Sequence, residues 1–169
     1  PLMLELAGEL ADIAVIGALL SPRGLRFALD YIQHGVARAR RSRADLEVML
    51  WITCYVTDDK EQWIERYRPS AAHILAGAPR AVFAALGLSE PFMHRLKQVY
   101  ASNGSAGAAS LVPNELVQEL AAIGSPQEVA DQLRVAVDMG IDQLGILVNA
   151  PTVEESEQAL RRFSAEVIP

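Results

Sequence analysis

The chain has 169 residues, a length typical of one domain. Because 51% of the residues are apolar and 21% are charged, the chain can bury a core, which excludes an intrinsically disordered protein. The net charge of −6 argues against nucleic-acid binding, which requires clustered Lys and Arg to neutralise phosphates. No apolar run reaches the roughly 20 residues of a membrane span, so we expect no membrane partner.

The chain contains a single cysteine, Cys54. One cysteine forms no internal disulfide and no cysteine-based zinc site, and it favours a reducing compartment. We therefore expect a cytoplasmic protein. Cys54 lies in the middle of an apolar run without a cation near it in sequence, so a buried, unreactive thiol is the favoured interpretation over a nucleophile.

Three segments are predicted to be buried strands, at residues 13–20, 46–56 and 143–148. Each is a continuous apolar run, the pattern of strands covered on both faces in a parallel sheet. A helix-start signal follows each strand: Ser21 before Pro22, Asp58 three residues before Glu61, and Thr152 three residues before Glu155. A further helix is predicted from Pro126 to Gly140, opened by Ser125 and Glu128. This alternation predicts βα units in a parallel sheet.

A long insertion, about residues 69–124, separates the second and third predicted strands. Short helices are predicted in it at 80–87, 91–101 and 114–122. Residues 102–110 are all Ser, Asn, Gly or Ala, so we expect a mobile segment that buries little. In a barrel such a loop lies on the catalytic face, which makes it a candidate flap over the mouth. The alternative is an exposed linker between two helices.

Three strands make a poor independent sheet. A parallel barrel with further strands upstream would explain both the alternation and a chain that is already amphipathic at residue 2. We therefore expect residues 1–169 to form one partial barrel domain, with 69–124 as a helical insertion, within a longer polypeptide.

The histidines and the one basic cluster carry no clear catalytic signal. His34, His73 and His94 lack metal-ligand spacing, so we expect exposed or partly packed helix residues and no metal site. The cluster consists of Arg38, Arg40, Arg41 and Arg43. It ends a helix, where cations interact favourably with the helix dipole.

The residues Gly17, Ala18, Leu19 and Leu20 end a strand directly before a helix cap. In a barrel this is where ligands contact the protein, so these residues are candidates for a substrate pocket. The alternative is a tight turn without a binding role.

The order and spacing of several motifs resemble the luciferase-like monooxygenase superfamily. The matching segments are residues 1–12 (PLMLELAGELAD), 21–25 (SPRGL), 48–59 (VMLWITCYVTDD), 111–117, 124–130 and 139–142. Ile13 stands where the family has Gly after the Asp. Within the superfamily, the chain resembles the methylenetetrahydromethanopterin-reductase-like branch, many members of which use the deazaflavin coenzyme F-420. Other members of the superfamily use FMN.

The resemblance implies a (βα)8 TIM barrel with a helical insertion before the last βα unit, of which this chain is the C-terminal half. It implies that the coenzyme phosphate is held by backbone N–H groups at the start of the first helix, here at Leu2 and Met3 with Pro1 at the edge of the site. The catalytic residues are expected in the N-terminal half. Where sugar-phosphate-using relatives carry a hydroxyl and a Lys, residues 17–20 are apolar, which favours an uncharged small organic substrate.

The implied activity is hydride transfer with coenzyme F-420 or a flavin as cofactor. An FMN-dependent monooxygenase is the alternative, and a non-catalytic half barrel that associates with itself is a hypothesis of another class. A half barrel exposes two sheet edges and an apolar face, so we expect a homo-oligomer. We also expect the chain alone to be inactive and to bind neither F-420 nor FMN tightly.

Overall fold

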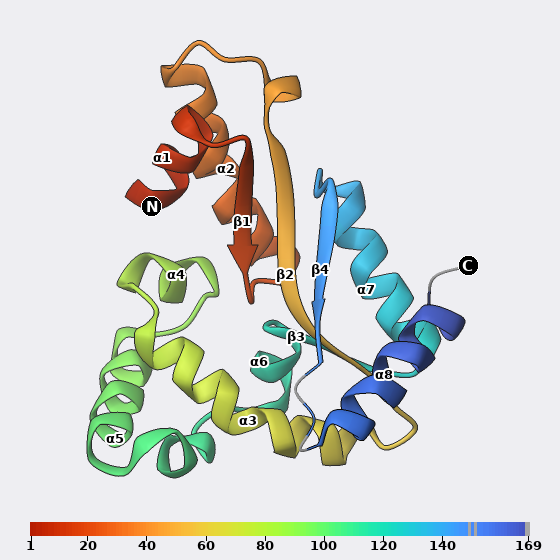
Figure 1. Cartoon of the computed structure of the whole chain (residues 1–169). Coiled ribbons are helices and arrows are strands. Elements are labelled where there is room, and N and C mark those ends of the chain that lie inside the picture. The colour runs from red at the N-terminus through yellow and green to blue at the C-terminus, as the bar shows by residue number, and fades with distance from the viewer. Residues whose placement is uncertain (149, 151, 168–169) are drawn as a thin grey trace.

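Parallel strands alternate with helices along the described residues, 1–148, 150 and 152–167 of the computed structural model (Figure 1). The strands are β1 (Ile13–Gly17), β2 (Glu47–Val56), β3 (Ala121–Gly124) and β4 (Gln143–Leu147). The helices are α1 (Leu2–Leu10), α2 (Pro22–Arg38), α3 (Lys60–Gly77), α4 (Arg80–Ala85), α5 (Glu90–Ala109), α6 (Asn114–Gln118), α7 (Pro126–Asp138) and α8 (Val153–Glu166), with a 3-10 turn at Arg43–Asp45. Among these helices, none combines the length and the apolar character needed to cross a bilayer.

The sheet is built around β2, which pairs with the other three strands. β1 pairs with its first half, β4 with its middle, and β3 with its last residues, all in parallel. Thr53 lies opposite both Ala121 of β3 and Leu147 of β4, so these two strands occupy opposite edges of β2. β3 therefore continues the edge that β1 begins, and the described sheet is at most three strands wide at any level.

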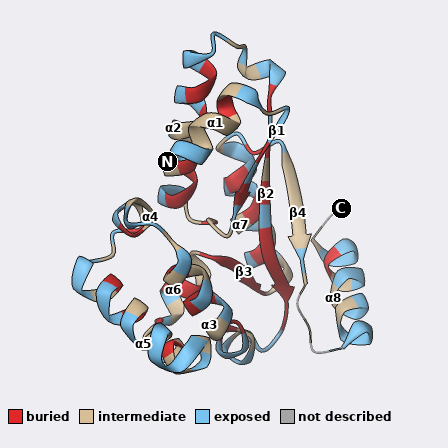
Figure 2. Cartoon of the chain, turned by 60° about the vertical axis from the view of Figure 1, so that its left-hand side comes forward, coloured by how far each residue is buried: buried red, intermediate tan, exposed pale blue. Residues whose placement is uncertain are grey.

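The two faces of this sheet have different surroundings. Alternate residues such as Ile16, Leu50 and Ile52 are buried in a cluster that includes side chains of α2, α7 and α8. On the opposite face, Val15 and Trp51 are each 49% exposed. Figure 2 shows β2 buried along most of its length and β4 only partly buried. Helices cover the outside of a parallel barrel, so the exposed face corresponds to the barrel interior.

We call this exposed side the inner face. It is defined by the register-matched residues Ile13, Val15, Gly17, Met49, Trp51, Thr53, Gly145 and Leu147.

Strand β3 differs from the sequence prediction, which placed a helix over 114–122. Helix α6 ends at Gln118, and residues 121–124 pair with β2 instead. Four apolar residues show no periodicity that distinguishes a strand from a helix, so only the pairing decides. The insertion is therefore followed by two βα units, β3–α7 and β4–α8, rather than by one. The predicted start of the insertion, at residue 69, falls inside α3, which continues to Gly77.

The predicted strand over 13–20 is also too long. β1 ends at Gly17 because Ala18 adopts a left-handed backbone with φ 51°. The predicted helix caps are confirmed for α2, α7 and α8, where Ser21, Ser125 and Thr152 each accept a hydrogen bond from a first-turn backbone N–H. Helix α3 is capped by Asp59, one residue later than predicted.

Glu128 connects the start of α7 to the start of α3. Its carboxylate accepts hydrogen bonds from Lys60 Nζ at 2.8 Å and from the Ser125 backbone N–H and hydroxyl at 2.8 and 2.9 Å. Lys60, followed by Ser125, lowers the pKa of Glu128 from 4.5 to about 2. Since the folded pKa is the lower one, this carboxylate stabilises the fold above pH 4.5, and that contribution is lost as the pH falls to about 2.

We therefore expect Glu128→Gln to lower the melting temperature at neutral pH. Wild type and variant should converge as the pH falls to about 2, as followed by circular dichroism. The control is Glu115→Gln, because Glu115 is an exposed first-turn glutamate of α6. A difference between Glu128→Gln and wild type that persists unchanged at low pH would contradict this account.

Candidate active site

The insertion covers the inner face only at the carboxyl ends of the strands. There Tyr55, Ala121 and Ile123 are buried in a second cluster with residues of α3, α5 and α6. Figure 1 shows these helices gathered at the end of the sheet toward which the strand arrows point. Parallel barrels hold their active sites at this end, so the junction of sheet and insertion is the candidate site.

A pocket of about 410 Å³ opens at this junction. Its lining consists of Thr53, Tyr67, Pro69, Ser70, His73, Ile74, Ser105 and Leu147. Thr53 and Leu147 come from opposite strands of the inner face, residues 67–74 from α3, and Ser105 from α5. None of the lining residues is Asp, Glu, Lys or Arg, and five of them carry a hydroxyl or an imidazole. Such a wall suits an uncharged group that forms hydrogen bonds.

Two hydrogen bonds fix the polar side chains of the pocket. The Tyr67 hydroxyl bonds to Thr53, and burial raises the pKa of Tyr67 even though this bond acts in the opposite direction. Tyr67 is therefore a neutral phenol at physiological pH. His73 Nδ1 lies 2.6 Å from the Tyr100 hydroxyl, which connects α3 to α5 beside the pocket.

The segment 102–110, expected to be mobile, is mostly helical. Helix α5 continues through it to Ala109 and is broken at Gly104, with φ 68° and ψ −169°. The expectation that this segment packs no core is wrong, because Ala108 is fully buried in the second cluster. Alanine is the best helix former, so a small-residue run becomes helical where one residue finds a packing partner. Ser105 of this segment lines the pocket, and a role as a flap stays a prediction.

Gly104→Ala is expected to destabilise this part of α5 by about 2 kcal/mol, because residues with a side chain rarely adopt this conformation. Relief of the strain requires the break to move, which displaces Ser105 from the pocket wall. Hydrogen exchange of residues 105–109 should accelerate, whereas the exposed Ser102→Ala control should leave it unchanged. Equal exchange in both variants would contradict the role of the break.

The predicted phosphate-binding residues begin α1. Leu2 and Met3 are 63% and 77% exposed, and the Pro1 carbonyl accepts the N–H groups of Leu4 and Glu5. Helix α1 packs against α2 and runs opposite to β1 (Figure 1), so its N-terminus is directed toward the carboxyl end of that strand. The role of Pro1, Leu2 and Met3 in cofactor binding stays a prediction.

The four predicted substrate-pocket residues are separated by the turn after β1. Gly17 lies open on the inner face beside Trp51, and the Ala18 N–H donates to the Trp51 carbonyl at 3.1 Å. Leu19 packs against both clusters. Leu20 is only 4% exposed, and its N–H donates to the Glu119 carbonyl at 2.8 Å. Of the four, Gly17 has the most direct access to a ligand in the barrel interior.

The cysteine, the basic cluster and two of the histidines lie in settings that indicate no catalytic role. Cys54 is buried as predicted, and burial raises the pKa of its thiol to about 12, which makes it unreactive. Arg38 pairs with Glu5 and Glu9 of α1, and Arg43 pairs with Asp142 at 2.7 Å. His34 and His94 are exposed. Within the described residues, no three His, Cys, Asp or Glu side chains gather as a metal site.

The pocket residues of α3 were not identified from the sequence. His73 was interpreted as an ordinary helix residue, and Tyr67 and Ser70 were not singled out. A polar stripe at helical spacing was the available signal, but the strand ends that complete the pocket are distant in sequence.

The family model described as luciferase-like monooxygenase matches residues 1–143. A 5,10-methylenetetrahydromethanopterin reductase from Methanopyrus kandleri is 27% identical over 170 residues, which cover 100% of this chain and 48% of the relative. The solved structure of the coenzyme F-420-dependent tetrahydromethanopterin reductase from the same organism superposes with a TM-score of 0.82 at 24% identity, over 100% of this chain and 48% of that one.

Two further structures have the same fold at lower similarity. An F-420-dependent secondary alcohol dehydrogenase in complex with an F-420–acetone adduct gives a TM-score of 0.64 at 19% identity, over 98% of this chain and 46% of that one. A riboflavin lyase with modified FMN and riboflavin gives 0.59 at 15% identity, over 98% and 39%. The chain thus spans about half the length of the relatives it matches, and its fold is one half of the luciferase-like TIM barrel.

Proposed function

Because the chain belongs to the luciferase-like monooxygenase family, we propose that it forms the C-terminal half of a barrel oxidoreductase that transfers hydride between coenzyme F-420 and a small organic substrate. The observation that carries this proposal is the open inner face, which leads to a pocket under the insertion at the carboxyl ends of the strands. An inner face lined by Val15 and Trp51 needs a covering layer, and a barrel supplies one.

Relatives named as F-420-dependent favour a deazaflavin as the cofactor. An FMN-dependent monooxygenase is the second candidate, favoured by the neighbour that holds a modified FMN. In both cases the cofactor, when bound, supplies the redox chemistry, and the protein binds it and excludes water.

Two parts of this chain have roles in the proposal. The start of α1 offers the backbone N–H groups of Leu2 and Met3 and the positive end of a helix dipole to the cofactor phosphate, with Pro1 at the edge of the site. The pocket receives the substrate, with the neutral phenol of Tyr67 as a hydrogen-bonding group. Because the lining carries no Asp, Glu, Lys or Arg, the group that enters the pocket is uncharged.

The proposal is tested with a fusion protein, in which this chain follows the part of the Methanopyrus kandleri reductase that the match does not cover. Reduced F-420 is added anaerobically with acetone, and the oxidised coenzyme is followed by its absorbance. Reoxidation that requires the ketone supports hydride transfer. Turnover only with reduced FMN and oxygen would favour the monooxygenase, and no turnover with either cofactor would refute the proposal.

A further inference from the structure

Three side chains form a stack at the carboxyl end of β2. The rings of Tyr55 and Trp63 lie 4.0 Å apart at an angle of 29°, and the Arg66 guanidinium lies 5.0 Å from the centre of the Trp63 ring. Tyr55 is buried on the inner-face side, Trp63 is partly buried and Arg66 is exposed. The stack therefore extends from the second cluster to the surface.

Arg66 forms no ion pair or hydrogen bond with the part of the chain that the structure describes; its contact is the face of the indole. On α3, the positions three and four residues away hold Gln62, Trp63, Pro69 and Ser70, none of which is acidic. The adjacent Glu65 is paired with Arg68, which lowers the pKa of Glu65. Because stacking uses only the flat face of a guanidinium, the N–H groups around its edge remain available as donors.

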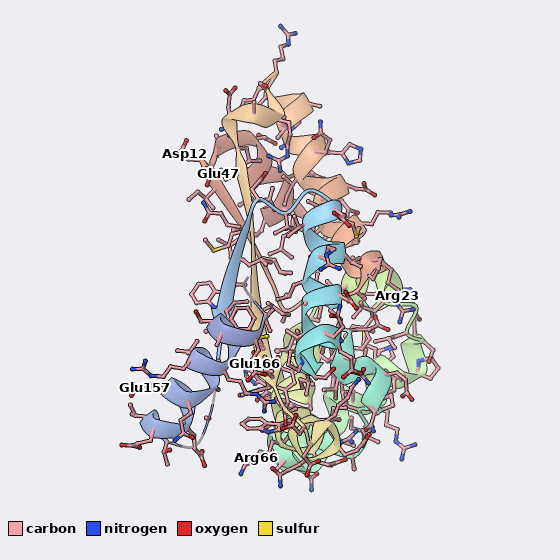
Figure 3. The ribbon with its side chains drawn as sticks, turned by 90° about the vertical axis from the view of Figure 1, so that its right-hand side faces the viewer. Asp12, Arg23, Glu47, Arg66, Glu157 and Glu166 are labelled. Atoms are coloured by element: carbon pink, nitrogen blue, oxygen red, sulfur yellow. The ribbon has the colours of Figure 1, made fainter. Side chains whose placement is uncertain are left out.

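Arg66 lies on the same helix as the pocket residues Ser70 and His73, one turn before Ser70. Arg66, Ser70 and His73 are spaced at i, i+4 and i+7 on α3, so they share one face of the helix. Ser70 and His73 line the pocket, and Arg66 precedes Ser70 by one turn, with its guanidinium turned back over Trp63. Figure 3 shows Arg66 at the opposite end of the molecule from Asp12 and Glu47, which lie at the amino ends of β1 and β2. Arg66 thus belongs to the end of the fold that holds the pocket.

We propose that Arg66, oriented by Trp63, is a recognition site for a phosphate or carboxylate group of the ligand whose uncharged part occupies the neighbouring pocket. Planar guanidinium groups bind both kinds of oxyanion through paired, charge-assisted hydrogen bonds. Stacking on Trp63 restricts the side chain before the anion arrives, which reduces the entropy lost on binding. The identity of the ligand rests on the proposed function, whereas the anion site itself does not.

The test uses the chain with Trp51→Phe, so that Trp63 is its single tryptophan. Inorganic phosphate, succinate and neutral glycerol are titrated separately at constant ionic strength, and Trp63 fluorescence is recorded. We expect a saturable change with phosphate or succinate and none with glycerol. A preference for phosphate assigns the site to a phosphate-bearing ligand, and a preference for succinate assigns it to a carboxylate.

Three variants separate this site from general charge attraction. Arg66→Gln should weaken anion binding about tenfold, and Arg66→Lys should weaken it less, because it keeps the charge but loses the planar fork. Arg95→Gln, at an exposed arginine of α5, should have no effect. Equal binding by Arg66→Gln and wild type, or an equal response to glycerol, would overturn the proposal. The titration involves no hydride transfer, so its failure is distinguishable from failure of the proposed function.

Discussion

Gly35→Ala is expected to lower the free energy of unfolding by about 3 kcal/mol, because it introduces a methyl group where α1 and α2 have no room for one. A Cβ at Gly35 would overlap the backbone carbonyl of Glu5, and a Cβ at Gly8 would overlap that of Ile32. Backbone atoms inside two packed helices cannot move aside as a flexible side chain can. The helices must separate, which also displaces the start of α1 and its proposed phosphate site.

Urea unfolding measures this loss, and Gly77→Ala is the matched control. Gly77 ends helix α3, and nothing lies within 4 Å of the position that an added methyl group would take, so the same change there should be neutral or stabilise the fold by about 0.5 kcal/mol. Equal stability of the two variants would refute the close helix crossing. Loss of protection in α1 by hydrogen exchange would show that α1 is the part displaced.

Val15→Glu is expected to weaken self-association of the chain about a hundredfold, because association through the inner face would bury an unpaired charge. Val137→Glu is the control: Val137 has the same 49% exposure but lies on α7, outside the inner face. Sedimentation at several concentrations should show wild type and Val137→Glu associating and Val15→Glu dissociating. A wild-type chain that sediments as a uniform monomer at every concentration would contradict the account.

The expected association does not close a barrel by itself. The described sheet is at most three strands wide, because β1 and β3 share one edge of β2. Two copies therefore provide about six strands at any level, fewer than the roughly eight of a (βα)8 barrel. The completing half must supply the missing strands, which is why we expect it to displace self-association.

The sequence predicted those parts of the fold that local signals determine. The run at 46–56 forms strand β2, although the predicted cover on both faces is wrong at Trp51, which is exposed on the inner face. Ser125 with Glu128 caps α7 through neighbours three residues apart. Strand β3 depends on pairing with β2, some 70 residues earlier in the chain, and four apolar residues alone do not encode that pairing. The helix through 105–109 also depends on a contact distant in sequence, the burial of Ala108 in the second cluster.

The candidate site was predictable only in part. The resemblance predicts a site at the start of α1 and the end of β1, whereas the pocket combines Thr53, Tyr67 and Leu147 from three elements. Their approach is set by the register of β2 with β4 and by the packing of α3 across the inner face. No spacing within the sequence expresses that arrangement.

A titration of coenzyme F-420 tests the central claim, that this chain is one wall of a deazaflavin-binding barrel. The fluorescence of F-420 is measured with the chain alone and with the chain joined to the upstream half of the Methanopyrus kandleri reductase. We expect tight binding only to the joined protein, together with protection of Trp51 from a soluble quencher as the inner face is covered. Sub-micromolar binding by the chain alone, or a folded joined protein that binds no F-420 and leaves Trp51 exposed, would contradict the account.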